Sequence, residues 1–157
     1  MDAKTRKHRY KLKCSGYAVI AFGAWSIIRV FMMKYLNPLG LENMLGSSEY
    51  EAGYEPVIFI FFIVILAFDL LFRLYIGRNA IREGNGERRR LTYVVLAALY
   101  VGVSIWSDFS YIVGLFSGKS SSDVLAAIIV DLTTCVALVE ITVSSLYLRK
   151  LGKGKTA

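Results

Sequence analysis

The sequence predicts an all-α fold, an integral membrane four-helix bundle with its N- and C-termini in the cytoplasm. Hydrophobic residues make up 55% of the 157 residues, charged residues only 20%, and the mean hydropathy is +0.50. The apolar residues are concentrated in four blocks of about 18 residues or more, enough to cross a hydrocarbon core of roughly 30 Å. We therefore expect a four-helix transmembrane domain over residues 16–148.

The first helix is expected over residues 16–35, after a basic leader at residues 1–15 that holds six of the 19 Lys and Arg. It should end at Asn37-Pro38, because a residue that precedes proline disfavours the helical conformation. The apolar block is long and lacks a convincing small-residue cleavage site, which indicates a retained helix rather than a cleaved signal peptide.

The second helix is expected over residues 56–83 and contains the most apolar stretch of the chain. Its ten residues VIFIFFIVIL have no polar atom in a side chain. Pro56 suits the first helical position, where its missing N–H group is not needed. Gly84 and Gly86 suit the end of the helix, because glycine readily adopts the left-handed conformation found there.

The third and fourth helices are expected over residues 91–116 and 122–148, followed by a basic cytoplasmic tail at 149–157. Ser120 and Asp123 form a possible capping box before the fourth helix. The connection between these helices is short, so they should be antiparallel neighbours. A row of mostly small residues on the third helix resembles a helix-packing motif of low specificity, and its members are Ala98, Gly102, Ser110 and Gly114.

The basic residues predict the orientation. Fifteen of the 19 Lys and Arg lie in the leader, in residues 77–90 at and beyond the end of the second helix, and in the tail. By contrast, the connection from Tyr35 to Glu55 has four acids and no Lys or Arg. Because Lys and Arg collect on the cytoplasmic side of membrane proteins, both chain ends should be cytoplasmic. We expect a multi-pass protein of the plasma or inner membrane.

The net charge of +7 also bears on partners. The basic residues flank apolar helices, so topology explains them and no nucleic-acid partner is predicted. Such a surface attracts the anionic lipid of the cytoplasmic face of the bilayer, by on the order of 1 kcal/mol for each basic group.

Six ionisable residues interrupt the apolar blocks, although each costs about 2.5 to 3.5 kcal/mol at mid-bilayer. Their positions along the helices predict two charged layers, at depths of roughly 8 to 10 Å and 20 to 25 Å from the outer end. The inner layer comprises Asp69, Arg73 and Glu140, and the outer layer comprises Arg29, Asp108 and Asp131. Asp69 and Arg73 can pair on one helix face. Arg29 is the natural partner for the two acids of its layer.

Two interpretations of these layers stay open. The charges are structural ion pairs that orient the helices, or they line a polar interior of a transport or channel-type protein, with Glu140 as the proton- or cation-handling group. The alternative function is a non-catalytic accessory or regulatory subunit of a membrane complex. Partners are expected to be the lipid bilayer and either a second copy or another membrane subunit. The sequence has no catalytic signature, and a single histidine gives no metal-site spacing, so no enzyme, metal or cofactor is predicted.

Overall fold

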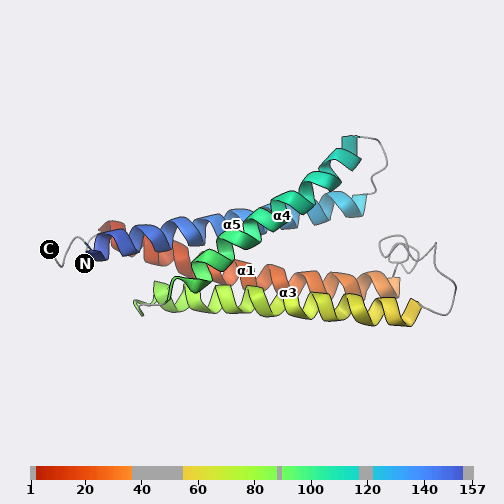
Figure 1. Cartoon of the computed structure of the whole chain (residues 1–157), viewed down its shortest axis with the longest axis horizontal. Coiled ribbons are helices and arrows are strands. Elements are labelled where there is room, and N and C mark those ends of the chain that lie inside the picture. Colours follow the sequence, from red (N-terminus) through yellow and green to blue (C-terminus); the bar gives the residue numbers. More distant parts are fainter. Residues whose placement is uncertain (1–2, 37–54, 88–89, 117–121, 154–157) are drawn as a thin grey trace. The chain divides into compact units, whose positions relative to one another are not determined.

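A computed structural model describes residues 3–36, 55–87, 90–116 and 122–153, apart from the side chains at 33–34, 55–56, 58, 107–108, 110–116, 122–127 and 152–153. Over these residues the chain forms four helices and no strand (Figure 1). The helices are α1 (Ala3–Leu36), α3 (Glu55–Gly84), α4 (Thr92–Phe116) and α5 (Ser122–Lys153). The predicted all-α fold is confirmed, and a helix lies at each of the four predicted places.

Three of the helices are long and apolar enough to cross a membrane: α1 over Ala3–Met32, α3 over Phe59–Gly84 and α5 over Ile128–Leu151. The fourth helix, α4, has 25 residues, and its described apolar part is the shorter segment Thr92–Trp106. The composition of a membrane-embedded helical protein is therefore confirmed for three helices. Membrane crossing by α4 and the cytoplasmic placement of the chain ends stay predictions.

The end of α3 shows why the glycines after it matter. Gly86 has a φ of 103°, in the left-handed region that glycine adopts without steric cost. Its N–H donates to the carbonyl of Glu83 at 3.0 Å, and the N–H of Glu87 donates to the carbonyl of Arg82 at 3.1 Å. This pair of bonds is the Schellman arrangement, which satisfies carbonyls that the helix leaves open.

The helices divide into two compact units. The first unit contains Met1–Val19 and Tyr75–Ala157, and the second contains Ile20–Leu74. Both α1 and α3 contribute one part to each unit. The basic leader is part of the first unit and is helical from Ala3, so the charged residues before the apolar block lie on a continuous helix.

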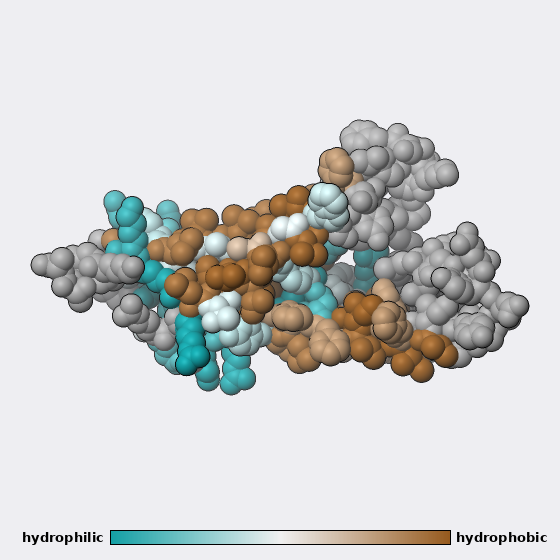
Figure 2. Space-filling view, in the orientation of Figure 1, coloured by the Kyte–Doolittle hydropathy of each residue, from teal (hydrophilic) through white to brown (hydrophobic). Residues whose placement is uncertain are grey.

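In the first unit, neighbouring helices are antiparallel. His8 and Lys11 of α1 contact Ser144 and Glu140 of α5, so residue numbers rise along one helix as they fall along the other. Helices α4 and α5 also pack together and run in opposite directions, which confirms the predicted antiparallel pair (Figure 1). In Figure 2 the hydrophilic residues of this unit gather near the chain ends.

The core of the first unit combines side chains from all four helices. Its buried members are Leu12, Val19, Ile76, Ala80, Tyr93, Val94, Ala97, Ala137, Leu138 and Ile141. Most are aliphatic, and burial of such a side chain stabilises a fold in water by about 1.5 to 3 kcal/mol. Within lipid, close van der Waals packing and interhelical polar contacts replace much of that driving force. The polar contacts of this unit are therefore central to how its helices are held.

Helices α1 and α3 approach closely at two glycines of the first unit. A Cβ atom added to Gly16 would lie 2.9 Å from the carbonyl oxygen of Gly77 and 2.9 Å from Cγ1 of Ile81. A Cβ added to Gly84 would lie 2.9 Å from the carbonyl oxygen of Arg9. The two distances to backbone carbonyl oxygens are shorter than a Cβ atom tolerates, so both positions require glycine.

The row of small residues predicted on α4 has no such role in the part of it that the structure describes. Ala98 is exposed, and a Cβ added to Gly102 would meet nothing within 4 Å. Side chains further along the row lie outside the described residues. Within its described half, the row does not pack against the other helices of this chain.

The second unit contains the C-terminal part of α1 and the N-terminal part of α3. The side chain of Arg73 is buried and passes over Gly23, where an added Cβ would lie 3.0 Å from Cδ of Arg73. Around this contact many large apolar side chains are exposed, among them Trp25, Phe31, Phe61, Phe68 and Leu71. Such an apolar surface is compatible with contact with lipid and costly in contact with water.

Candidate functional site

Two clusters of polar side chains lie within the first unit. The Glu83 network consists of Glu83, Tyr93, Ser145 and Arg149. The Glu140 cluster consists of His8, Lys11, Ser15, Glu140 and Ser144. Ser144 and Ser145 are adjacent on α5, so the two clusters are neighbours along that helix.

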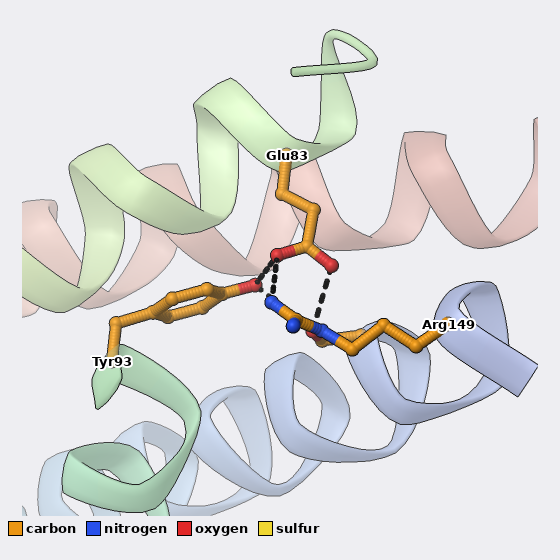
Figure 3. Close-up of polar contacts among 4 residues, drawn as sticks. Glu83, Tyr93 and Arg149 are labelled. Atoms are coloured by element: carbon orange, nitrogen blue, oxygen red, sulfur yellow. Dashed lines mark hydrogen bonds and ion pairs between the residues drawn. The ribbon is translucent and has the colours of Figure 1, made fainter. Parts of the chain in front are cut away.

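The Glu83 network joins three helices through one carboxylate (Figure 3). The hydroxyl of Tyr93 on α4 donates to Oε2 of Glu83 at 2.6 Å, and the hydroxyl of Ser145 on α5 donates to Oε1 at 2.9 Å. Nη2 of Arg149, one turn further along α5, donates to Oε2 at 2.9 Å. Both carboxylate oxygens are thus engaged, one of them twice.

Burial distinguishes this network from a surface ion pair. The side chain of Glu83 is 8% exposed and that of Arg149 is 20% exposed, while Tyr93 and Ser145 are fully buried. A buried carboxylate that accepts from a guanidinium and two hydroxyl groups has a donor on each oxygen and a charged partner. The Glu83 network is therefore suited to holding α3, α4 and α5 in one fixed arrangement.

The Glu140 cluster joins α1 and α5. Nζ of Lys11 lies 2.6 Å from Oε1 of Glu140, and the hydroxyl of Ser15 donates to Oε2 at 2.8 Å. Lys11 and Ser15 are one helical turn apart on α1, so they face the carboxylate together. The side chains of Lys11 and Glu140 are 42% and 34% exposed, much more than the Glu83–Arg149 pair.

His8 lies at the edge of the Glu140 cluster. Its Nδ1 is 3.5 Å from the hydroxyl oxygen of Ser144, and its ring centroid is 4.2 Å from that of Tyr147. Ser144 follows Glu140 by one turn of α5 and shares its face of the helix. The cluster therefore places an aromatic pair beside a carboxylate, a hydroxyl and an ammonium group.

The structure confirms one predicted contact of the inner layer. Nε of Arg73 lies 2.8 Å from Oδ2 of Asp69, and the two side chains are 7% and 24% exposed. Both belong to the second unit, whereas Glu140 belongs to the first unit. That Glu140 shares a depth with this pair stays a prediction.

The outer layer is described only in part. Arg29 of α1 and Asp131 of α5 are both half-buried, and the side chain of Asp108 lies outside the described residues. The predicted pairing of Arg29 with the two acids stays a prediction.

The contact partners in both clusters were not predicted from the sequence. The sequence predicts Glu83 as the last residue of the second helix, Arg149 as part of the basic tail and Lys11 as part of the basic leader. A signal was present in the sequence: Glu83 lies at the end of a very apolar helix, with Arg82 before it and a tyrosine ten residues further on. On α5, Ser145 and Arg149 are spaced to face one partner together.

The Asp69–Arg73 pair predicts an asymmetric response to mutation. Asp69→Ala should lower the stability of the protein more than the double change Asp69→Ala with Arg73→Met. The single change removes the carboxylate beside a buried guanidinium, whereas the double change also removes the charge and keeps an apolar stem over Gly23. Thermal unfolding in detergent micelles measures both variants. Equal melting temperatures would contradict a stabilising role for this pair.

Metal-binding chemistry is not indicated where the structure describes side chains. Among those residues, no group of three or more His, Cys, Asp or Glu is close enough to hold a metal ion. Neither Cys14 nor Cys135 forms a disulfide bond.

No protein-family model matches this sequence, and no curated protein or solved structure is significantly similar to it.

Proposed function

We propose that this chain is a non-catalytic, multi-pass protein of the transport or channel type, located in the plasma or inner membrane. The Glu140 cluster would be the polar site at which it handles protons or other cations. The observation that carries the proposal is the Lys11–Glu140 ion pair, which is short, joins two helices and is partly exposed. A carboxylate that can be reached, inside a helix long and apolar enough to span a membrane, is a typical ion-handling group.

The Lys11–Glu140 pair also has the chemistry of an exchangeable contact. A lysine ammonium is a compact charge on a flexible four-carbon stem and can leave one partner without disturbing the backbone. The Glu83–Arg149 pair differs, because Tyr93 and Ser145 also hold its carboxylate and the pair is buried. Of the two clusters, the Glu140 cluster is therefore the one able to change partners.

The position of the cluster along the chain supports access from one side of the membrane. Lys11 precedes the predicted first membrane span, which begins at Gly16, by little more than one helical turn. The nearby leader residues Lys4, Arg6 and Lys7 are exposed and suited to anionic lipid headgroups. We place the Glu140 cluster at the cytoplasmic boundary of the hydrocarbon core, where a cation can arrive from water.

A second candidate function is favoured by the Glu83 network. Three donors from two helices hold one buried carboxylate of a third, which is the pattern of a structural connection. Such a connection is expected of a non-catalytic accessory or regulatory subunit. Such a subunit would contact another membrane protein, whereas a transport protein of this size would more simply act as a homo-oligomer. Purification in mild detergent separates the two candidates by showing either an unrelated partner or copies of this chain.

The transport proposal predicts a specific loss in Glu140→Gln. This variant keeps the size and most of the hydrogen bonding of the side chain but removes its charge. It should fold normally and abolish cation-dependent flux in proteoliposomes, measured with a pH-sensitive dye under imposed proton and potassium gradients. Glu87→Gln is the matched control, because Glu87 is an exposed acid outside both clusters, and its flux should equal that of the unmodified protein.

The flux and the folding of the Glu140→Gln protein together test whether Glu140 handles cations. A folded Glu140→Gln protein with unchanged flux would remove Glu140 from the mechanism. Failure of this variant to fold, as seen by size-exclusion chromatography and circular dichroism, would favour the accessory function. An unmodified protein that carries neither protons nor potassium nor sodium would contradict the transport proposal for those ions.

A further inference from the structure

We infer that the Glu140 cluster is a binding site for a primary ammonium group, and that Lys11 occupies this site as an internal ligand. The inference deepens the proposed transport function and depends on it for the direction of movement, although binding itself can be tested separately. The ligand class is a small organic amine in its protonated form.

The contacts of Lys11 show which chemistry the site accepts. Its terminal ammonium lies 2.6 Å from Oε1 of Glu140, a charge-assisted hydrogen bond. The hydroxyl of Ser15 donates to Oε2 at 2.8 Å and so fixes the orientation of the carboxylate independently of Lys11. If the lysine ammonium leaves, the carboxylate stays oriented toward the same position. A free ammonium group with the same N–H donors can then take that position.

The contacts of the site favour a primary ammonium group over quaternary ammonium ions and hard divalent ions. A quaternary ammonium ion has no N–H donor and cannot approach Oε1 to hydrogen-bonding distance. Hard divalent ions bind tightly where several protein oxygens converge, whereas the described contacts supply one carboxylate and one hydroxyl. A primary ammonium group needs fewer partners and is already accommodated by the protein in the form of Lys11.

The neighbouring residues favour an organic amine over the ammonium ion itself. Ser144 lies one turn from Glu140 on the same face of α5, and His8 contacts it from α1. The ring of His8 lies against that of Tyr147, with centroids 4.2 Å apart. These rings offer an apolar surface beside the carboxylate on which the carbon chain of an amine can pack.

Lys11 also determines the affinity. As a residue attached to α1, it competes with free amines at an effective concentration on the order of millimolar or more. Its side chain is 42% exposed, so displacement into water requires no rearrangement of the core. Amines should therefore bind the unmodified protein weakly and bind a variant that lacks the lysine ammonium more tightly.

The test is chemical rescue of Lys11→Ala. The purified variant is melted in detergent micelles with methylammonium or butylammonium chloride, and separately with tetramethylammonium chloride at the same ionic strength. Primary amines at about tenfold excess over their dissociation constant should raise the melting temperature by about 2 to 5 °C relative to the quaternary salt. Butylammonium should act at lower concentration than methylammonium. The double variant Lys11→Ala with Glu140→Gln is the control and should show no difference between salts.

Equal melting temperatures in primary and quaternary salts would overturn the inference. If Lys11→Ala does not fold, Lys11→Gln retains a hydrogen-bond donor toward Glu140 and is used for the same comparison. The result is distinguishable from failure of the proposed function. Rescue without flux in proteoliposomes would leave an amine site in a protein that does not transport, and flux that depends on Glu140 without rescue would leave transport with a different cation.

Discussion

Glu83→Ala should lower the free energy of unfolding by about 3 to 5 kcal/mol, the loss typical of removing one partner from a buried ion pair. The variant leaves the guanidinium of Arg149 and the hydroxyls of Tyr93 and Ser145 without their shared acceptor. Because Arg149 is only 20% exposed, water recovers little of the lost interaction. Denaturant titration in detergent micelles, followed by circular dichroism, measures the effect.

Three further variants make this expectation specific. Tyr93→Phe removes one hydroxyl donor to the buried carboxylate and should cost about 1.5 to 3 kcal/mol. The double change Glu83→Ala with Arg149→Met removes both charges and should cost less than Glu83→Ala alone. Glu87→Ala removes an exposed acid and should cost less than about 1 kcal/mol. A loss for Glu83→Ala no larger than that for Glu87→Ala would show that the network does not hold the helices together.

Gly16→Ala should destabilise the protein although alanine is the better helix former. The new methyl group would lie 2.9 Å from the carbonyl oxygen of Gly77 and from Cγ1 of Ile81, so α1 and α3 must move apart. Overpacking of this kind costs about 1 to 3 kcal/mol, and Gly16→Leu should cost more. The same denaturant titration measures the change.

Gly102→Ala is the matched control for this close approach. Gly102 also lies within a helix, but an added Cβ meets nothing within 4 Å. The change should be neutral or stabilise the protein by up to about 1 kcal/mol, as helix propensity predicts. If the alanines at positions 16 and 102 have the same effect, the close approach of α1 and α3 at Gly16 is wrong.

The structural features that could be predicted from the sequence are those that depend on neighbouring residues in the chain. The long apolar blocks predicted the positions of all four helices. Within lipid there is no water to bind the backbone N–H and C=O groups, and a helix pairs these groups within one segment. Glycine at positions 84 and 86 predicted the end of α3 correctly, since the left-handed conformation of Gly86 is a local requirement. The Asp69–Arg73 contact was predictable for the same reason, because residues four apart on a helix are neighbours in any tertiary arrangement.

The candidate sites depend on which helices are neighbours, and one sequence does not contain that information directly. Glu83 and Arg149 are 66 positions apart, and Lys11 and Glu140 are 129 apart. Lys11 and Arg149 also fit the positive-inside pattern, so topology already accounts for their charges and predicts no specific partner. A basic residue at a membrane boundary can serve topology and a specific contact together, and composition does not distinguish the two.

The wide separation of the Glu83 partners has a consequence for synthesis. Glu83 leaves the ribosome 62 residues before Ser145 and 66 before Arg149. At about 5 to 20 residues per second, its carboxylate waits roughly 3 to 13 seconds for them. During that interval α4 is made and brings the hydroxyl of Tyr93, while the two donors of α5 are still missing. The last helix therefore completes the contacts of this carboxylate, and a chain that stops before Ser145 lacks two of its three donors.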